Sequence, residues 1–158
     1  MPAKLAVTVE NETPRLLLAL NGIAFHSKPR LKTRYRHVVI AEDDMHLRKL
    51  LAARFRFVGY TVTECANGVE LLHELADILD RRRPSEVDLI ISDIRMPGLS
   101  GMEVLEGLRD LEHQIPMVLI TAFGSDDLHT QAKRLGANAI FDKPFDVEEL
   151  VAEVSKII

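Results

Sequence analysis

Short apolar runs alternate with helix-spaced apolar stripes along the chain from residue 37 onward. Five runs have the length and composition of strands, and they cover residues 37–42, 60–64, 87–93, 116–121 and 137–142. The first, third and fourth are almost unbroken Val, Ile and Leu, which is typical of parallel strands buried on both faces. The second is more polar, and we expect it at an edge of the sheet.

Each predicted strand is followed by apolar residues at helical spacing, so the chain predicts five helices as well. Alternation of strands and helices is typical of an α/β fold, a doubly wound five-stranded parallel sheet with helices on both faces. The predicted stripes are Leu47, Leu50, Leu51, Phe55 and Val58; Leu71, Leu72, Leu75, Ala76 and Leu79; Val104, Leu105, Leu108 and Leu111; Leu128, Ala132 and Leu135; and Val147, Leu150, Val151, Val154 and Ile157.

Charge divides the chain into two unequal parts. Residues 1–36 hold seven Lys/Arg and two Asp/Glu, whereas residues 37–158 hold thirteen and twenty-two. With 158 residues, 47% of them hydrophobic, the chain can bury one core. We expect a flexible basic extension over residues 1–36 and one acidic domain over residues 37–158. An acidic body lacks the basic face that nucleic acids require, so direct nucleic-acid binding is not expected.

The expected cellular location of the protein is inferred from the absence of a membrane-spanning stretch and of an export signal in the sequence. The longest apolar stretch, residues 16–25, is interrupted by Asn21 and Gly22 and is too short to span a bilayer. Glu10 and Glu12 precede it, where an export signal carries positive charge. The single Cys65 excludes an internal disulfide and is interpreted as a packing residue. We expect a cytoplasmic protein with no membrane span.

Polar residues gather where the predicted strands end. Glu42 and Asp43 close the first strand, Asp93 the third and Thr121 the fourth, and Lys143 follows the fifth. Doubly wound sheets bind ligands beyond these strand ends. Carboxylates brought together repel one another, so a hard cation such as Mg²⁺ and an incoming phosphoryl group are the natural reason to assemble them.

Four motifs carry a resemblance to a known family. They are AEDD at residues 41–44, SDIRMPG at 92–98, ITA at 120–122 and DKPF at 142–145. In these motifs the chain resembles the receiver domain of two-component response regulators, over roughly residues 37–158. The resemblance implies a flavodoxin-like (βα)5 fold and a single-domain protein similar to the chemotaxis regulators.

The resemblance also implies roles for individual residues. Asp93 would accept a phosphoryl group from a histidine kinase or a histidine phosphotransfer protein, as a nucleophile. The metal ligands would be Asp43, Asp93, the main-chain carbonyl of Arg95 and, through water, Glu42. Asp44 is interpreted instead as the cap of the first helix, where its carboxylate can accept hydrogen bonds from free backbone N–H groups.

Two further residues would handle the phosphoryl oxygens. The resemblance assigns Lys143 to the bound phosphoryl group, with its bond to Pro144 usually in cis. It assigns Thr121 to an oxygen whose capture pulls the loop after this residue inward on phosphorylation. Both side chains suit the oxygens of a phosphoryl group in transit.

The chain departs from the family pattern at two places. The position of the usual switch aromatic is Ile140, and strand alternation directs the neighbouring Phe141 to the opposite face. Arg95 and Phe123 lie two residues beyond the nucleophile and the threonine and flank the path of a hydrolysing water. We therefore hypothesise that Phe123 limits water access and prolongs the phosphoryl state.

These observations favour a stand-alone response regulator that is not an enzyme for other substrates, although it would catalyse its own Mg²⁺-dependent phosphorylation and dephosphorylation. Its output would pass through an unknown downstream protein. A second interpretation is a phosphorelay intermediate that hands the phosphoryl group to a histidine phosphotransfer domain; Ile140 favours it, because a relay needs no aromatic switch.

Two more functions have weaker support in the sequence. A phosphatase of the haloacid dehalogenase type would carry its nucleophile on the first strand with an aspartate two residues later, an arrangement that residues 42–44 lack. The basic extension could be an arm for nucleic acid or a membrane surface, but it has few aromatics and no recognisable motif, which favours a disordered segment.

Overall fold

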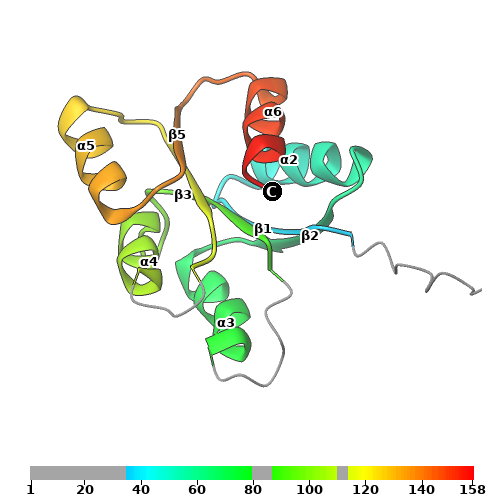
Figure 1. Ribbon diagram of the computed structural model, residues 1–158, viewed down its shortest axis with the longest axis horizontal. Helices are drawn as coiled ribbons and strands as arrows, with labels where there is room; N and C mark the ends of the chain where they lie inside the picture. Colours follow the sequence, from blue (N-terminus) through cyan, green and yellow to red (C-terminus); the bar gives the residue numbers. More distant parts are fainter. Residues whose placement is uncertain (1–34, 80–86, 110–113) are drawn as a thin grey trace, which may run out of the picture. The chain divides into compact units, whose positions relative to one another are not determined.

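The structure is a computed structural model, and it describes residues 35–79, 87–109 and 114–158 (Figure 1). In these residues five parallel strands form one sheet in the order β2-β1-β3-β4-β5. The strands are β1 (His37–Ala41), β2 (Thr61–Cys65), β3 (Leu89–Asp93), β4 (Met117–Thr121) and β5 (Ala139–Asp142). The helices are α2 (Met45–Phe57), α3 (Gly68–Leu79), α4 (Gly101–Leu108), α5 (Asp126–Leu135) and α6 (Val147–Ile157). The predicted extension over residues 1–36 lies outside the described residues apart from Tyr35 and Arg36, and Leu111 lies outside them as well.

The predicted doubly wound α/β sheet is confirmed, and the strand boundaries shift by one or two residues. The more polar strand β2 lies at an edge, as expected. It begins at Thr61 because the N–H of Tyr60 donates to the carbonyl of Phe55 and so closes the turn after α2. Strand β1 ends at Ala41, which leaves Glu42 just beyond the sheet.

Two apolar layers cover the sheet. The helices α2 and α6 pack on one face, and α3, α4 and α5 pack on the other (Figure 1). Neighbouring residues of a strand face opposite layers, as Val38 and Val39 do. Cys65 is buried in the layer of α3 to α5, which confirms its packing role, and burial raises the pKa of its thiol to about 12.

The helical stripes were predicted too wide. Leu50 on α2 is 55% exposed, and Val58, Leu72 and Ala76 are exposed too. On α2 the buried residues are Leu51, Ala52 and Phe55 instead. Each helix presents only one narrow face to the sheet, so a side chain at the border of the stripe reaches solvent. None of the described helices is long and apolar enough to cross a membrane.

Candidate functional site

Three carboxylates meet where the order of the strands reverses, between β1 and β3. One oxygen each of Glu42, Asp43 and Asp93 lies within 4.8 Å of the others. Glu42 is fully buried and Asp93 is 5% exposed, whereas Asp43 faces solvent. Parallel strands bring their carboxyl ends to one edge, which is why residues far apart in the sequence converge.

Lys143 brings a cation to this cluster from the end of β5. Its Nζ donates to Oδ2 of Asp93 at 2.8 Å and to Oε1 of Glu42 at 3.1 Å. Burial tends to lower the pKa of Lys143, but the hydrogen bonds to Asp93 and Glu42 outweigh it and raise that pKa. The Lys143–Pro144 peptide bond is cis. The lysine is therefore held charged against two carboxylates.

Glu42 is left incompletely satisfied by this lysine. Its Oε2 lies 2.9 Å from Nζ, within ion-pair distance but outside hydrogen-bond geometry, and this buried oxygen has no hydrogen-bond partner among the described residues. Burial raises the pKa of Glu42, and the Asp93 carboxylate adds to the rise against the lowering effect of Lys143. A buried carboxylate in this state calls for a further donor or cation.

The donor set fits Mg²⁺, a hard cation that takes oxygen ligands and keeps several waters. The exposed Asp43 opens the cluster to solvent, and Glu42 supplies the buried Oε2, which accepts no hydrogen bond from the described residues. Oδ1 of Asp93 accepts a hydrogen bond from the N–H of Arg95 at 3.0 Å, so the main chain of Arg95 runs beside the cluster. Three of the four predicted metal-site residues thus form one cluster, and the main-chain N–H of the fourth, Arg95, is hydrogen-bonded to it.

Thr121 lies at the end of β4, next to β3, and is buried. Its Oγ1 accepts a hydrogen bond from the N–H of Phe123 at 3.1 Å. Its carbonyl accepts from the N–H of Lys143 at 2.7 Å, which ties the threonine to the lysine through the main chain. The predicted hydroxyl and the predicted cation therefore belong to one hydrogen-bonded unit.

Arg95 and Phe123 come from two different loops, those after β3 and β4, and they contact each other. The guanidinium carbon of Arg95 lies 4.2 Å from the centre of the Phe123 ring, although Phe123 remains 62% exposed. Such a stack is an attractive cation–π contact. The sequence pattern predicted that each residue flanks the path of the water that would hydrolyse the phosphoryl group. It did not predict that the two side chains contact each other.

Asp44 caps α2, as predicted. Its Oδ1 accepts hydrogen bonds from the N–H groups of His46 at 2.8 Å and Leu47 at 3.1 Å, and these bonds lower the pKa of the carboxyl. Sequence reasoning missed Arg48, whose Nη1 donates to the carbonyl of Glu42 at 2.6 Å and steadies the loop that carries the acidic pair. A basic residue near the start of the helix after the acidic pair was the available signal.

The last strand, β5, confirms that Ile140 and Phe141 face opposite layers. Ile140 packs in the layer of α3 to α5, and Phe141 packs in the opposite layer, where its ring meets that of Phe145 with centroids 5.8 Å apart. Phe141 is therefore on the wrong face of β5 to replace an aromatic at position 140.

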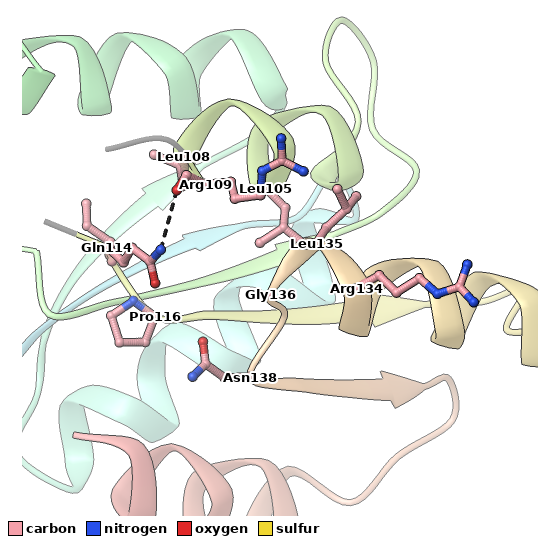
Figure 2. Close-up of a pocket in the computed structure, with 10 residues that line it drawn as sticks. Leu105, Leu108, Arg109, Gln114, Pro116, Arg134, Leu135, Gly136 and Asn138 are labelled. Atoms are coloured by element: carbon pink, nitrogen blue, oxygen red, sulfur yellow. Dashed lines mark hydrogen bonds between the residues drawn. The ribbon is translucent and has the colours of Figure 1, made fainter. Parts of the chain in front are cut away.

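A separate hollow of about 290 Å³ lies at the other end of the sheet, between α4 and α5 (Figure 2). Leu105, Leu108 and Leu135 line it, and at its rim the amide of Gln114 donates to the carbonyl of Arg109. Among the described residues that line it, none carries a carboxylate or a nucleophile. The acidic cluster is therefore the candidate site.

Comparison with known proteins agrees with this geometry. The family model described as the response regulator receiver domain matches residues 38–155. Sporulation initiation phosphotransferase F of Bacillus subtilis is 34% identical over 121 residues, which cover 77% of this chain and 92% of that protein. The DNA-binding transcriptional regulator NtrC of Escherichia coli is 34% identical over 121 residues, 77% of this chain but only 24% of the regulator.

Solved structures show the same fold. The chemotaxis response regulator CheY4 of Vibrio cholerae matches with a TM-score of 0.66 and 25% identity, over 78% of this chain and 99% of that chain. A receiver domain from Clostridium thermocellum has a TM-score of 0.69 at 20% identity, over 78% and 94% of the two chains. The chain therefore belongs to the response regulator receiver domains of two-component signalling, which are phosphorylated on an aspartate, bind Mg²⁺ at an acidic pocket and interact with histidine kinases and phosphotransfer proteins.

Proposed function

We propose that Asp93 is the phosphoryl acceptor of this protein. The observation that carries the proposal is the position of its carboxylate, which ends β3 beside Glu42 and Asp43 and lies 2.8 Å from Nζ of Lys143. The carboxylate of Asp93 is nearly buried and lies against a charged lysine. The same lysine can stabilise the negative charge of a phosphoryl group that is transferred to Asp93.

In the proposed reaction an oxygen of Asp93 attacks the phosphorus of the donor. A new O–P bond forms, and the P–N bond of a phosphohistidine breaks with the electron pair leaving on the imidazole nitrogen. Lys143 exchanges its bond to Asp93 for one to a phosphoryl oxygen, and the Thr121 hydroxyl donates to another. Bound Mg²⁺ would be held by Asp43, Asp93, the Arg95 carbonyl and, through water, Glu42; its charge would stabilise the phosphoryl oxygens.

The proposed output is a change in the surface made by α5, β5 and α6, read by a downstream protein. This proposal is supported by the way the site residues are connected along the chain to these three elements. Thr121 leads through a short loop into α5, and Lys143 lies at the end of β5 and leads into α6. An aspartyl phosphate adds up to about two negative charges, enough to bias a two-state loop that contacts only the phosphorylated form.

A phosphorelay role is the second candidate. Ile140 is packed in the apolar layer, where the switch aromatic of the family would be, and a relay needs no such switch. The similarity to a sporulation phosphotransferase also favours this candidate. Transfer of the phosphoryl group from the phosphorylated chain to an added histidine phosphotransfer domain would identify a relay. Retention of the phosphoryl group on the chain would favour the stand-alone regulator.

Intact mass after incubation with Mg²⁺ and acetyl phosphate tests the proposal. We expect one added phosphoryl group in the natural chain, none in Asp93→Asn and an undiminished adduct in Asp44→Asn. The last variant is a matched control, because asparagine can still cap α2. An adduct that persists in Asp93→Asn would refute the assignment.

A further inference from the structure

Arg48 holds the main chain of the loop that carries the acidic pair. Its Nη1 donates to the carbonyl of Glu42 at 2.6 Å and to the carbonyl of Asp43 at 3.4 Å. Its main-chain N–H donates to the carbonyl of Asp44 at 2.9 Å. A guanidinium nitrogen of this kind carries more than one hydrogen, so it can serve two acceptors. The three consecutive carbonyls between β1 and α2 therefore all accept hydrogen bonds from one residue.

The guanidinium of Arg48 is itself held by Glu64 on the edge strand β2. Nε of Arg48 lies 3.9 Å from Oε2 of Glu64, and only 13% and 14% of the two side chains are exposed. Glu64 also pairs with Lys49 at 2.9 Å and with Arg56 at 3.0 Å. Because the carboxylate is anchored and the arginine is mostly covered, the guanidinium has little freedom to swing away from the loop.

These contacts determine the direction of the Asp43 side chain. The peptide group is planar, so the two carbonyls that Nη1 holds fix the peptide planes on either side of the Asp43 Cα atom. The Asp43 carboxylate is exposed and accepts no hydrogen bond from the described residues, so its main chain is what orients it. Glu42 is fixed from its other end as well, because its N–H donates to the carbonyl of Cys65 at 3.1 Å.

We propose that Arg48 is a positioning residue of the metal site, which holds residues 42–44 so that the Glu42 and Asp43 carboxylates converge on a cation. This inference rests on the proposed function, because it takes those two carboxylates as the groups that hold Mg²⁺. Arg48 acts through the main-chain carbonyls, whereas its positive charge by itself repels a bound cation. Positioning and charge therefore predict opposite effects of removing the arginine.

Titration with Mg²⁺, followed by the amide signals of residues 42–44, separates the two effects. We expect about tenfold weaker binding in Arg48→Ala, the lower end of the range for groups that orient metal ligands. Lys49→Met is the matched control, because it removes the adjacent cation, which pairs with Glu64 and donates to none of the three carbonyls. Its affinity for Mg²⁺ should stay the same or rise. Unchanged or tighter binding in Arg48→Ala, or equal weakening in both variants, would overturn the positioning role.

Amide hydrogen exchange in EDTA tests the anchoring of the loop without any metal. In Arg48→Ala we expect exchange at Glu42 to quicken more than exchange at Ile90. The N–H of Glu42 belongs to the anchored loop, whereas that of Ile90, in β3, donates to the carbonyl of Pro116 at 2.9 Å. Equal acceleration at the two amides would indicate a general loss of stability and would contradict local anchoring. If the natural chain fails to bind Mg²⁺, the proposed function is wrong, and the exchange pattern still decides whether Arg48 anchors the loop.

Discussion

Lys143 is the side chain on which the electrostatic balance of the site depends. It pairs with Asp93 and with the fully buried Glu42, whose Oε2 has no hydrogen-bond partner even in its presence. Without the lysine, the buried carboxylate of Glu42 would have no ion-pair partner among the residues that the structure describes. Removing one partner of a buried pair costs more than the pair itself contributes.

The first prediction is that Lys143→Met lowers the free energy of unfolding in EDTA at pH 7 by about 1–3 kcal/mol. The raised pKa of Glu42 means that the folded state holds its proton more tightly than the unfolded state. The contribution of Glu42 to the free energy of unfolding is therefore fully present below the ordinary pKa of 4.5. It is lost as the pH rises through the raised pKa that Glu42 has in the folded protein. The deficit of the variant should shrink as the pH falls toward 4.5.

Urea unfolding at both pH values measures this effect. Lys49→Met is the control, because Lys49 is exposed and Glu64, its partner at 2.9 Å, still has Arg56 and Arg48 beside it, so the change should cost under about 1 kcal/mol. Equal losses in the two variants, or a Lys143→Met deficit that does not depend on pH, would contradict the prediction.

The second prediction concerns the stack of Arg95 on Phe123, which joins the loops after β3 and β4. If the stack limits water access, Phe123→Ala should lose its phosphoryl group about two- to fivefold faster, the factor that corresponds to an exposed cation–π contact. Decay of the phosphorylated protein, followed by intact mass, gives the rate. Phe57→Ala removes a comparable stack, that of Arg54 on Phe57 at 5.2 Å, from α2, and should leave the rate unchanged.

Among the helices, α4 begins with a complete capping box. Oγ of Ser100 accepts a hydrogen bond from the N–H of Glu103, and the Glu103 carboxylate accepts one from the N–H of Ser100. The N–H and the hydroxyl of Ser100 both donate to the Glu103 carboxylate, and these two bonds lower the pKa of Glu103. The cap follows the loop after Asp93, so it fixes the helix start close to the site.

The third prediction is that Ser100→Ala lowers the free energy of unfolding by about 1 kcal/mol. The reason is that the N–H of Glu103 loses its acceptor and the box that closes the first turn is broken. Thermal or urea unfolding measures the loss, and Ser155→Ala on α6, whose Oγ donates to the carbonyl of Ala152, serves as the comparison with a smaller effect. A cost for Ser155→Ala as large as that for Ser100→Ala would argue against the capping role.

For the molecule as a whole, a cation at the acidic cluster should couple to folding. Glu42 and Asp43 follow β1, and Asp93 ends β3, so the cluster exists only in the folded chain. A ligand that binds only the folded state stabilises it by mass action.

The fourth prediction is that Mg²⁺ raises the free energy of unfolding, by about 2.7 kcal/mol at one hundred times its Kd. Asp43→Asn should lose most of this gain, because it removes the exposed carboxylate of the cluster. Unfolding with and without MgCl₂ at constant ionic strength measures the difference. The site assignment fails if Asp43→Asn responds to Mg²⁺ as strongly as the natural chain does.

Much of the molecule could be predicted from local pattern. Unbroken apolar runs indicated the buried parallel strands, and the polar run indicated the edge strand β2. The alternation of side chains along a strand was enough to separate Ile140 from Phe141. These features depend on periodicity, which neighbouring residues determine among themselves. The four motifs then indicated which residues to expect at the strand ends.

The tertiary structure alone decided which of these groups touch and how fully each is satisfied. The unpartnered Oε2 of Glu42, the Arg95–Phe123 stack and the Arg48–Glu64 contact join residues from different elements. The same holds for the exposure of Leu50 at the border of its stripe. A one-dimensional pattern specifies the direction of a side chain from its own element, whereas contact and burial depend on how elements distant in the sequence pack together.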